Sequence, residues 1–140
     1  MLTECEDELI AAVCKDTGKP PEEMRLSEVT QTLCAARLMV RSLRGWMADE
    51  RFASWGILFP STPTIRHEPH GVVLMIAPFN FPLMLILKPL LGAVAAGNCV
   101  LVKPSEACPE TSALVALRQR IYHKNNCLQA FIEGKQRRPL

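Results

Sequence analysis

The stretch from Gly71 to Glu106 constrains the fold of this chain more than any other part of the sequence. It holds two short apolar runs, Val72–Ile76 and Cys99–Val102, and a longer apolar segment between them, Leu83–Ala96. A proline precedes the longer segment and a glycine follows it, which is typical of a helix start and a helix end. The order therefore predicts a strand–helix–strand unit, and such a passage almost always has parallel strands.

The remaining carboxyl-terminal sequence extends this unit. Glu110–His123 is predicted to form a second crossover helix, and Leu128–Ile132 a third strand. We therefore predict an α/β fold class, with an incomplete Rossmann-like parallel sheet of three strands and crossover helices. Such a sheet is expected to be covered on both faces. The outer edge of the third strand would have no partner, which predicts low solubility.

Helices are expected before the sheet. Glu4–Lys15 has helical periodicity, Gly18 and Pro20 form a stop signal, and a new helix can begin at Pro21. A long helix then follows, marked by apolar residues at spacings of three and four: Leu26, Val29, Leu33, Ala36, Val40, Leu43 and Met47. This stripe favours an amphipathic helix packed on its own domain over a coiled coil.

A turn-rich stretch separates these helices from the sheet. Residues 53–70 contain three prolines and predict a linker or a hairpin, with Trp55–Phe59 and Thr64–Glu68 as short extended segments.

Composition excludes several classes of function. The net charge is +2, and the cations do not gather into an aromatic-rich patch, so no nucleic-acid partner is expected. The long apolar stretch is interrupted by prolines, glycines and asparagines, so no membrane span is expected. Six cysteines form no C-x-x-C pair, and no histidine lies at ligand spacing from them, so no metal site is predicted. The acidic amino terminus lacks a signal-peptide pattern, which predicts a reduced, cytoplasmic chain.

Polar residues follow both predicted strands, where open parallel sheets bind ligands. Asn80 follows the first strand, and Lys103, Ser105 and Glu106 follow the second. Asn80 could cap the helix or donate an N–H to an oxygen that gains charge in a reaction, and its spacing alone favours the cap. Lys103 and Glu106 could hold ribose hydroxyls or form an ordinary surface ion pair. The first turn lacks the G-x-G-x-x-G phosphate loop.

Three sequence blocks carry a family resemblance. A-P-F-N-F-P at 77–82, K-P-L-L-G-A-V-A-A-G-N at 88–98 and V-L-V-K-P-S-E at 100–106 resemble the aldehyde dehydrogenase superfamily in order and spacing. E-L-I-A-A-V-C-K-D-T-G-K-P at 8–20, L-S-E-V at 26–29 and I-R-H-E-P-H-G-V-V-L at 65–74 are similar to its class 3 branch. The resemblance extends from about Glu8 to Gly134.

The resemblance implies an enzyme that oxidises aldehydes to carboxylic acids with NAD or NADP. It implies that Asn80 is the side-chain donor of the oxyanion hole, which reverses the preference for a cap. Ala77, Pro78 and Phe79 resemble the backbone that lines the cofactor cleft. Lys103 and Glu106, with Ser105 beside them, resemble the groups that hold the adenosine ribose. The carboxylate of Glu106 favours NAD, and Lys103 leaves NADP open.

The sequence departs from the family pattern in the parts that complete the reaction. The 140 residues contain no Gly-Gln-x-Cys context for the nucleophile, no Glu-Leu-Gly-Gly context for the general base and no G-S-x-x-x-G turn for the cofactor phosphates. The chain therefore resembles an amino-terminal portion, with cofactor binding by the portion alone in doubt and catalysis not expected. A homo-oligomer, or a non-catalytic product that binds partner subunits or weakly binds nucleotide, is left open.

With this resemblance, the predicted organisation has four parts. Residues 1–52 are the N-terminal helices, 53–70 the linker or hairpin, 71–134 a partial NAD(P)-binding domain, and 135–140 a divergent tail.

Overall fold

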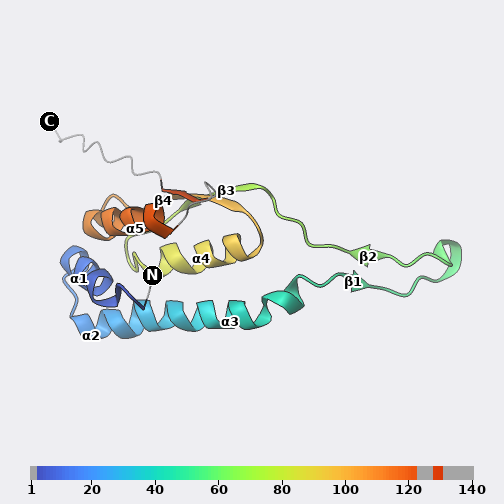
Figure 1. Cartoon of the computed structure of the whole chain (residues 1–140), viewed down its shortest axis with the longest axis horizontal. Coiled ribbons are helices and arrows are strands. Elements are labelled where there is room, and N and C mark those ends of the chain that lie inside the picture. Colours follow the sequence, from blue (N-terminus) through green and yellow to red (C-terminus); the bar gives the residue numbers. More distant parts are fainter. Residues whose placement is uncertain (1–2, 123–127, 131–140) are drawn as a thin grey trace.

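A computed structural model describes residues 3–122 and 128–130 of the chain. The helices are α1 (Glu6–Thr17), α2 (Pro21–Met24), the π-helical segment η1 (Arg25–Thr30), α3 (Gln31–Trp46), the short 3-10 helix η2 (Gly56–Leu58), α4 (Met84–Ala95) and α5 (Pro109–Tyr122). The strands are β1 (Glu50–Arg51), β2 (Thr64–Ile65), β3 (Val72–Ile76), β4 (Cys99–Lys103) and β5 (Leu128–Ala130). Figure 1 shows a body of helices and strands from which the β1–β2 segment extends.

The predicted parallel sheet is confirmed. Its strand order is β3-β4-β5, and both neighbouring pairs are parallel. Val72 lies opposite Cys99, and Ile76 lies opposite Lys103, so β3 and β4 pair along their whole lengths. The α/β fold class is therefore as expected. The predicted third strand begins at Leu128, and its residues 131–132 lie outside the described residues, as does the predicted tail at 135–140.

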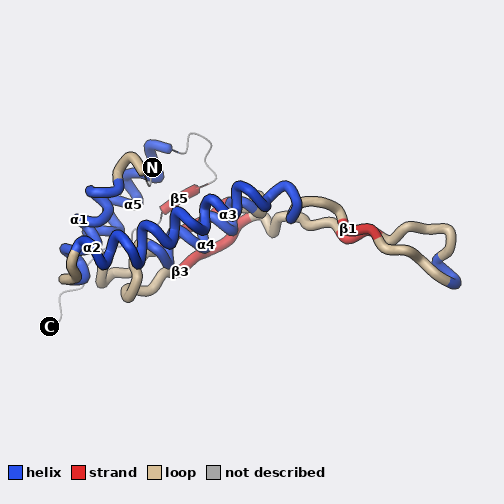
Figure 2. The backbone as a smooth tube through the Cα atoms, turned by 90° about the horizontal axis from the view of Figure 1, so that it is seen from below, coloured by secondary structure: helices blue, strands red, loops and turns tan. Residues whose placement is uncertain are grey.

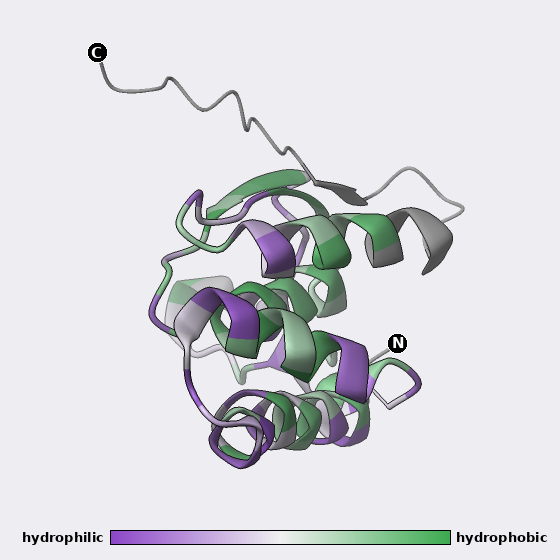
Figure 3. Cartoon of the chain, turned by 90° about the vertical axis from the view of Figure 1, so that its left-hand side faces the viewer, coloured by the Kyte–Doolittle hydropathy of each residue, from purple (hydrophilic) through white to green (hydrophobic). Residues whose placement is uncertain are grey.

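The described helices cover one face of this sheet. Figures 1 and 3 show the strands at the top of the body and the helices below them. The core between these layers contains Leu9, Leu83, Ile86, Val102 and Val115, each at most 1% exposed.

The expectation that both faces are covered is wrong for the described part of the chain. Val72, Leu74 and Ile76 are 76%, 59% and 67% exposed. Alternate residues of a strand point to opposite faces, so these three share the face that no described helix covers.

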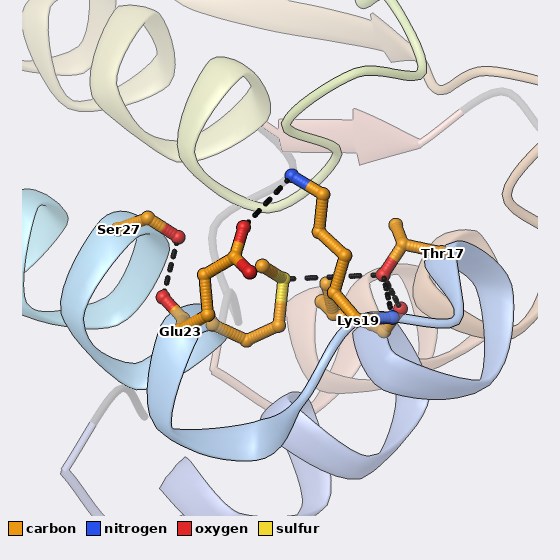
Figure 4. A network of polar contacts seen from close by, with 6 residues as sticks. Thr17, Lys19, Glu23 and Ser27 are labelled. Carbon is orange, nitrogen blue, oxygen red and sulfur yellow. Dashed lines mark hydrogen bonds and ion pairs between the residues drawn. The ribbon is translucent and has the colours of Figure 1, made fainter.

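The helices α1 and α2 are joined by a short connection. Gly18 ends α1 in the left-handed conformation, with φ +70°, and its N–H donates to the carbonyl of Cys14 at 2.8 Å. Figure 4 shows the polar contacts around this connection, where the Thr17 hydroxyl accepts from the N–H of Lys19 and the Lys19 ammonium pairs with Glu23 at 3.2 Å. The predicted stop at Gly18 is confirmed, although α1 runs two residues later than the predicted Glu4–Lys15.

The predicted apolar stripe is only partly buried. Val29 is 1% exposed, but Leu26, Val40 and Met47 are 68%, 79% and 64% exposed. Two physical reasons explain the exposure of Leu26 and Met47. The π-helical segment Arg25–Thr30 has a wider turn, which rotates Leu26 away from the face of the following α-helix. The carboxyl-terminal end of α3 also runs out toward the hairpin (Figure 2).

The turn-rich stretch forms a hairpin, which is one of the two structures predicted for it. β1 pairs with β2 in antiparallel fashion, with Glu50 opposite Ile65. The hairpin therefore starts at Glu50, three residues before the predicted boundary at 53. The prediction that Trp55–Phe59 is extended is wrong, because Gly56–Leu58 is a 3-10 helix at the tip.

Candidate functional site

Two turns meet at the carboxyl edge of the sheet. Because Ile76 and Lys103 lie opposite each other, β3 and β4 end at the same level. The N–H of Ala77 donates to the carbonyl of Lys103 at 3.0 Å, which continues the pairing by one residue. The topology therefore brings together the two groups of predicted site residues, 77–80 and 103–106.

The first turn presents Asn80 to solvent. Ala77 is 6% exposed, whereas Pro78, Phe79 and Asn80 are exposed. α4 begins only at Met84, and its N-cap residue is Leu83. The prediction that Asn80 could cap this helix is therefore wrong, because Asn80 lies too far before the first helical turn.

A glutamate from the N-terminal helices occupies the position of the cap. One carboxylate oxygen of Glu28, Oε2, accepts from the backbone N–H groups of Leu83 at 2.7 Å and Met84 at 3.0 Å. Glu28 lies in η1 and is 1% exposed. Burial raises the pKa of this carboxyl, and the two backbone hydrogen bonds and the charge of Lys19 oppose the rise.

Sequence reasoning missed Glu28. The available signal was an acidic residue directly beside Val29, inside a stripe predicted to be buried. A buried acid needs hydrogen-bond partners, and the first free N–H groups of a helix are suitable donors.

The second turn is held by a serine and an ion pair. The Lys103 ammonium lies 3.0 Å from a carboxylate oxygen of Glu106, and the Glu106 side chain is 74% exposed. The Ser105 hydroxyl accepts from the N–H of Ala107 at 3.3 Å. This geometry is that of a surface ion pair on a well-formed turn, with both charged groups accessible to a ligand.

Cys108 joins the two turns. Cys108 is 2% exposed, and its thiol donates to the carbonyl of Phe79 at 3.5 Å. Burial raises the pKa of this thiol, and the nearby carboxylates of Asp16 and Glu28 raise it further. A thiol in such surroundings stays protonated at neutral pH, which suits a structural role and not that of a nucleophile.

The helix that follows the second turn is capped in the same manner. The carboxylate of Asp16, at the end of α1, accepts from the N–H groups of Glu110 at 3.1 Å and Thr111 at 2.7 Å. Helix N-termini are common anion sites in nucleotide-binding folds. Here carboxylates of the chain itself occupy the N-termini of both α4 and α5, so neither offers these N–H groups to a ligand phosphate.

Other kinds of site receive no support in the described residues. No group of three or more His, Cys, Asp and Glu side chains could hold a metal ion there. None of the helices described is long and apolar enough to cross a membrane. A hollow of about 430 Å³ lies inside the hairpin loop, between Arg51–Ser54 and Phe59–Thr62, and none of the candidate residues borders it.

Comparison with known proteins points to one family. "Aldehyde dehydrogenase family 3 member I1, chloroplastic" from Arabidopsis thaliana is 40% identical over 134 residues, which are 96% of this chain and 24% of that protein. The structure titled "Substrate bound state of Staphylococcus Aureus AldH" superposes with a TM-score of 0.89 at 32% identity. That match covers 93% of this chain and 28% of the other. The chain thus spans about a quarter of the length of these relatives.

Two further solved structures are complexes with a nicotinamide cofactor. PnpE from Pseudomonas sp. WBC-3, in complex with nicotinamide adenine dinucleotide, superposes with a TM-score of 0.75 at 28% identity, and the match covers 92% of this chain and 26% of the PnpE chain. The glyceraldehyde-3-phosphate dehydrogenase GapN from Methanocaldococcus jannaschii, complexed with NADP, gives a TM-score of 0.71 at 27% identity, covering 93% of this chain and 28% of its own. The profile described as "Aldehyde dehydrogenase family" matches residues 1–121. The chain therefore belongs to the aldehyde dehydrogenase family.

Proposed function

We propose that this chain is the amino-terminal part of an NAD(P)-dependent aldehyde dehydrogenase, which oxidises an aldehyde to a carboxylic acid. One observation carries the proposal: the Asn80 turn and the Lys103–Glu106 turn lie side by side at the carboxyl edge of the sheet. In a member of this family, that edge is where an oxyanion donor and a ribose-binding pair would be needed together.

Each candidate residue has a role in this proposal. The exposed amide of Asn80 donates to the oxygen of the aldehyde as that oxygen gains negative charge. The backbone of Ala77, Pro78 and Phe79 lines the cofactor cleft. The Glu106 carboxylate accepts from a ribose hydroxyl, and Lys103 donates to the same sugar, with Ser105 shaping the turn.

The described residues fit the ribose of a dinucleotide better than its phosphates. The Lys103–Glu106 pair is accessible and can both donate and accept. The N-termini of α4 and α5 are already occupied by Glu28 and Asp16. NAD is the preferred cofactor in this proposal, because the Glu106 carboxylate would repel a 2′-phosphate.

Two proteins test the proposal. The 140-residue chain should produce no NADH from NAD and an aldehyde, because it contains no Gly-Gln-x-Cys segment to supply a nucleophile. A chimera of residues 1–121 with the rest of Staphylococcus aureus AldH should do so, measured by absorbance at 340 nm. Turnover by the 140-residue chain, or a folded but inactive chimera, would contradict the proposal.

A second role, binding to other subunits in a homo-oligomer, is favoured by the hairpin. The β1–β2 segment extends away from the body (Figures 1 and 2). Its tip exposes Trp55, Ile57 and Phe59 at 86%, 102% and 75%. Exposed apolar side chains gathered on one projection are typical of interaction surfaces. Replacing Trp55 and Ile57 with serine should lower the molar mass of the assembly in sedimentation equilibrium. An unchanged molar mass would reject this role.

We further propose a cytoplasmic location, which is supported by free thiols at Cys5, Cys14, Cys34 and Cys108, as is usual in reducing compartments. The Arabidopsis relative is described as chloroplastic. Fractionation of source cells with an antibody against this chain tests the location, and an organellar signal would contradict it.

A further inference from the structure

We infer that Glu28 is a positioning residue, which fixes the turn that carries Asn80 by accepting from the N–H groups of Leu83 and Met84 at the start of α4. This inference rests on the proposed role of Asn80 as a hydrogen-bond donor. It assigns to the N-terminal helices a part in shaping the site, although none of their side chains belongs to the two turns.

The contact is made across a long stretch of sequence. Glu28 accepts at 2.7 Å from Leu83 and at 3.0 Å from Met84, which lie 55 and 56 residues away in the chain. Leu83 is the N-cap residue of α4, and no side chain of the turn makes a cap hydrogen bond to this helix. The carboxylate therefore replaces a local cap and determines where the turn ends and the helix begins.

Other contacts fix the earlier part of the turn. The N–H of Ala77 donates to the carbonyl of Lys103, and the thiol of Cys108 donates to the carbonyl of Phe79. Asn80 thus lies between attachments to β4 and α5 on one side and the attachment to Glu28 on the other. The N–H of Leu85 also donates to the carbonyl of Phe81 at 3.0 Å, so this local bond would remain after loss of the Glu28 bonds. The N–H groups of Leu83 and Met84 would lose their acceptor, and the carboxyl-terminal half of the turn would be held less firmly.

Packing alone does not explain a glutamate at this position. Glu28 is 1% exposed, and its second oxygen, Oε1, has no hydrogen-bond partner among the described residues. Burying a carboxyl group is unfavourable, and an apolar side chain of similar size would fill the same space without that cost. The requirement is therefore for an acceptor, which the N–H groups of Leu83 and Met84 would otherwise lack.

Two substitutions of similar size separate acceptance from packing. Glu28→Met fills the space but offers no comparable acceptor, whereas Glu28→Gln fills it and retains a carbonyl oxygen. Glu22→Met is the matched control, because Glu22 lies six residues earlier and is exposed. The 140-residue chain, labelled with ¹⁵N, is studied without cofactor. The readouts are the hydrogen exchange of the Leu83 and Met84 amides and the mobility of the Asn80 side-chain amide.

In Glu28→Met, we expect the Leu83 and Met84 amides to exchange roughly tenfold faster, as for the loss of a helix cap. The Asn80 side-chain amide should become more mobile, while Ile10 and Val13 in α1 keep their exchange rates. Glu28→Gln should restore most of the protection, and Glu22→Met should change nothing. Equal behaviour of the Met and Gln variants, or equal acceleration throughout the chain, would overturn the inference.

A titration decides the case if Glu28→Met does not fold. The charge of Lys19 opposes the rise in the pKa of Glu28, and the charges of both Asp16 and Glu28 act on Cys108. The amide shifts of Leu83 and Met84 should follow the titration of Glu28 in the wild type and stay flat in Glu28→Gln. Identical shifts in both proteins would refute the inference. An inactive chimera with this pattern intact would instead count against the proposed function alone.

Discussion

Replacing Asp16 with alanine should destabilise the chain by removing the cap of α5. The carboxylate accepts at 2.7 Å from the N–H of Thr111 and at 3.1 Å from that of Glu110. Thr111 is fully buried, so its N–H cannot readily find water as a new partner, whereas Glu110 is exposed and can. The loss in unfolding free energy should therefore be close to that of one lost helix cap with one buried N–H left unpaired.

The expected loss in unfolding free energy is about 1–2 kcal/mol for a lost helix cap. An upper limit of about 3 kcal/mol applies if the buried donor stays unpaired. For a domain of this size, a loss of that kind lowers the melting temperature by roughly 4–10 °C. Asp16→Asn should lose about half as much, since the amide keeps one oxygen as an acceptor.

Urea unfolding followed by circular dichroism measures this loss. Asp49→Ala is the control, because Asp49 pairs with Arg66 at 3.3 Å on the exposed hairpin, and such surface pairs contribute about 0–1 kcal/mol. If Asp16→Ala destabilised the chain no more than the control, the capping contacts would not contribute as argued.

The remaining predictions concern pH, thiol reactivity and solubility. Since the pKa of Glu28 is raised above its usual 4.5, stability from this group is present below that pH and lost as pH rises through the folded pKa. The wild type should therefore lose unfolding free energy relative to Glu28→Gln as pH rises above 4.5, and a parallel pH dependence would contradict this. In the native chain, iodoacetamide should modify exposed Cys34 at least tenfold faster than buried Cys108, as measured by mass spectrometry. The two rates should become equal only after unfolding. The double substitution Leu74→Lys and Ile76→Lys should raise the soluble fraction after centrifugation without lowering the urea midpoint. The reason is that both side chains are exposed on the uncovered sheet face. Unchanged solubility would show that this face does not drive association.

The sheet could be predicted from the sequence because its signals are local. The apolar run Val72–Ile76 corresponds to β3 residue for residue, and β4 is one residue longer than predicted. The proline and glycine around α4 also predicted both ends of this helix to within one residue of their observed positions. The strand ends then followed from topology, which brought Asn80 and Lys103 to the same edge.

The contacts that shape the site could not be predicted, because they join distant parts of the chain. The residues around Glu28 and Asp16 form no local pattern that predicts a cap on a helix far away in the sequence. The position of Asn80 near a predicted helix start suggested a local cap instead. The exposure of Leu26 likewise depends on a π-helical turn, which changes the phase of a stripe that looked continuous.

The catalytic role of Asn80 is the central claim, and kcat of the chimera measures it most directly. Asn80→Ala in that chimera should lower kcat about 100- to 1,000-fold, as for the loss of one oxyanion donor. The Kd for NAD should stay within about twofold, because the proposed ribose contacts are made by Lys103 and Glu106. A kcat unchanged by Asn80→Ala, in a folded chimera that binds NAD normally, would contradict the account.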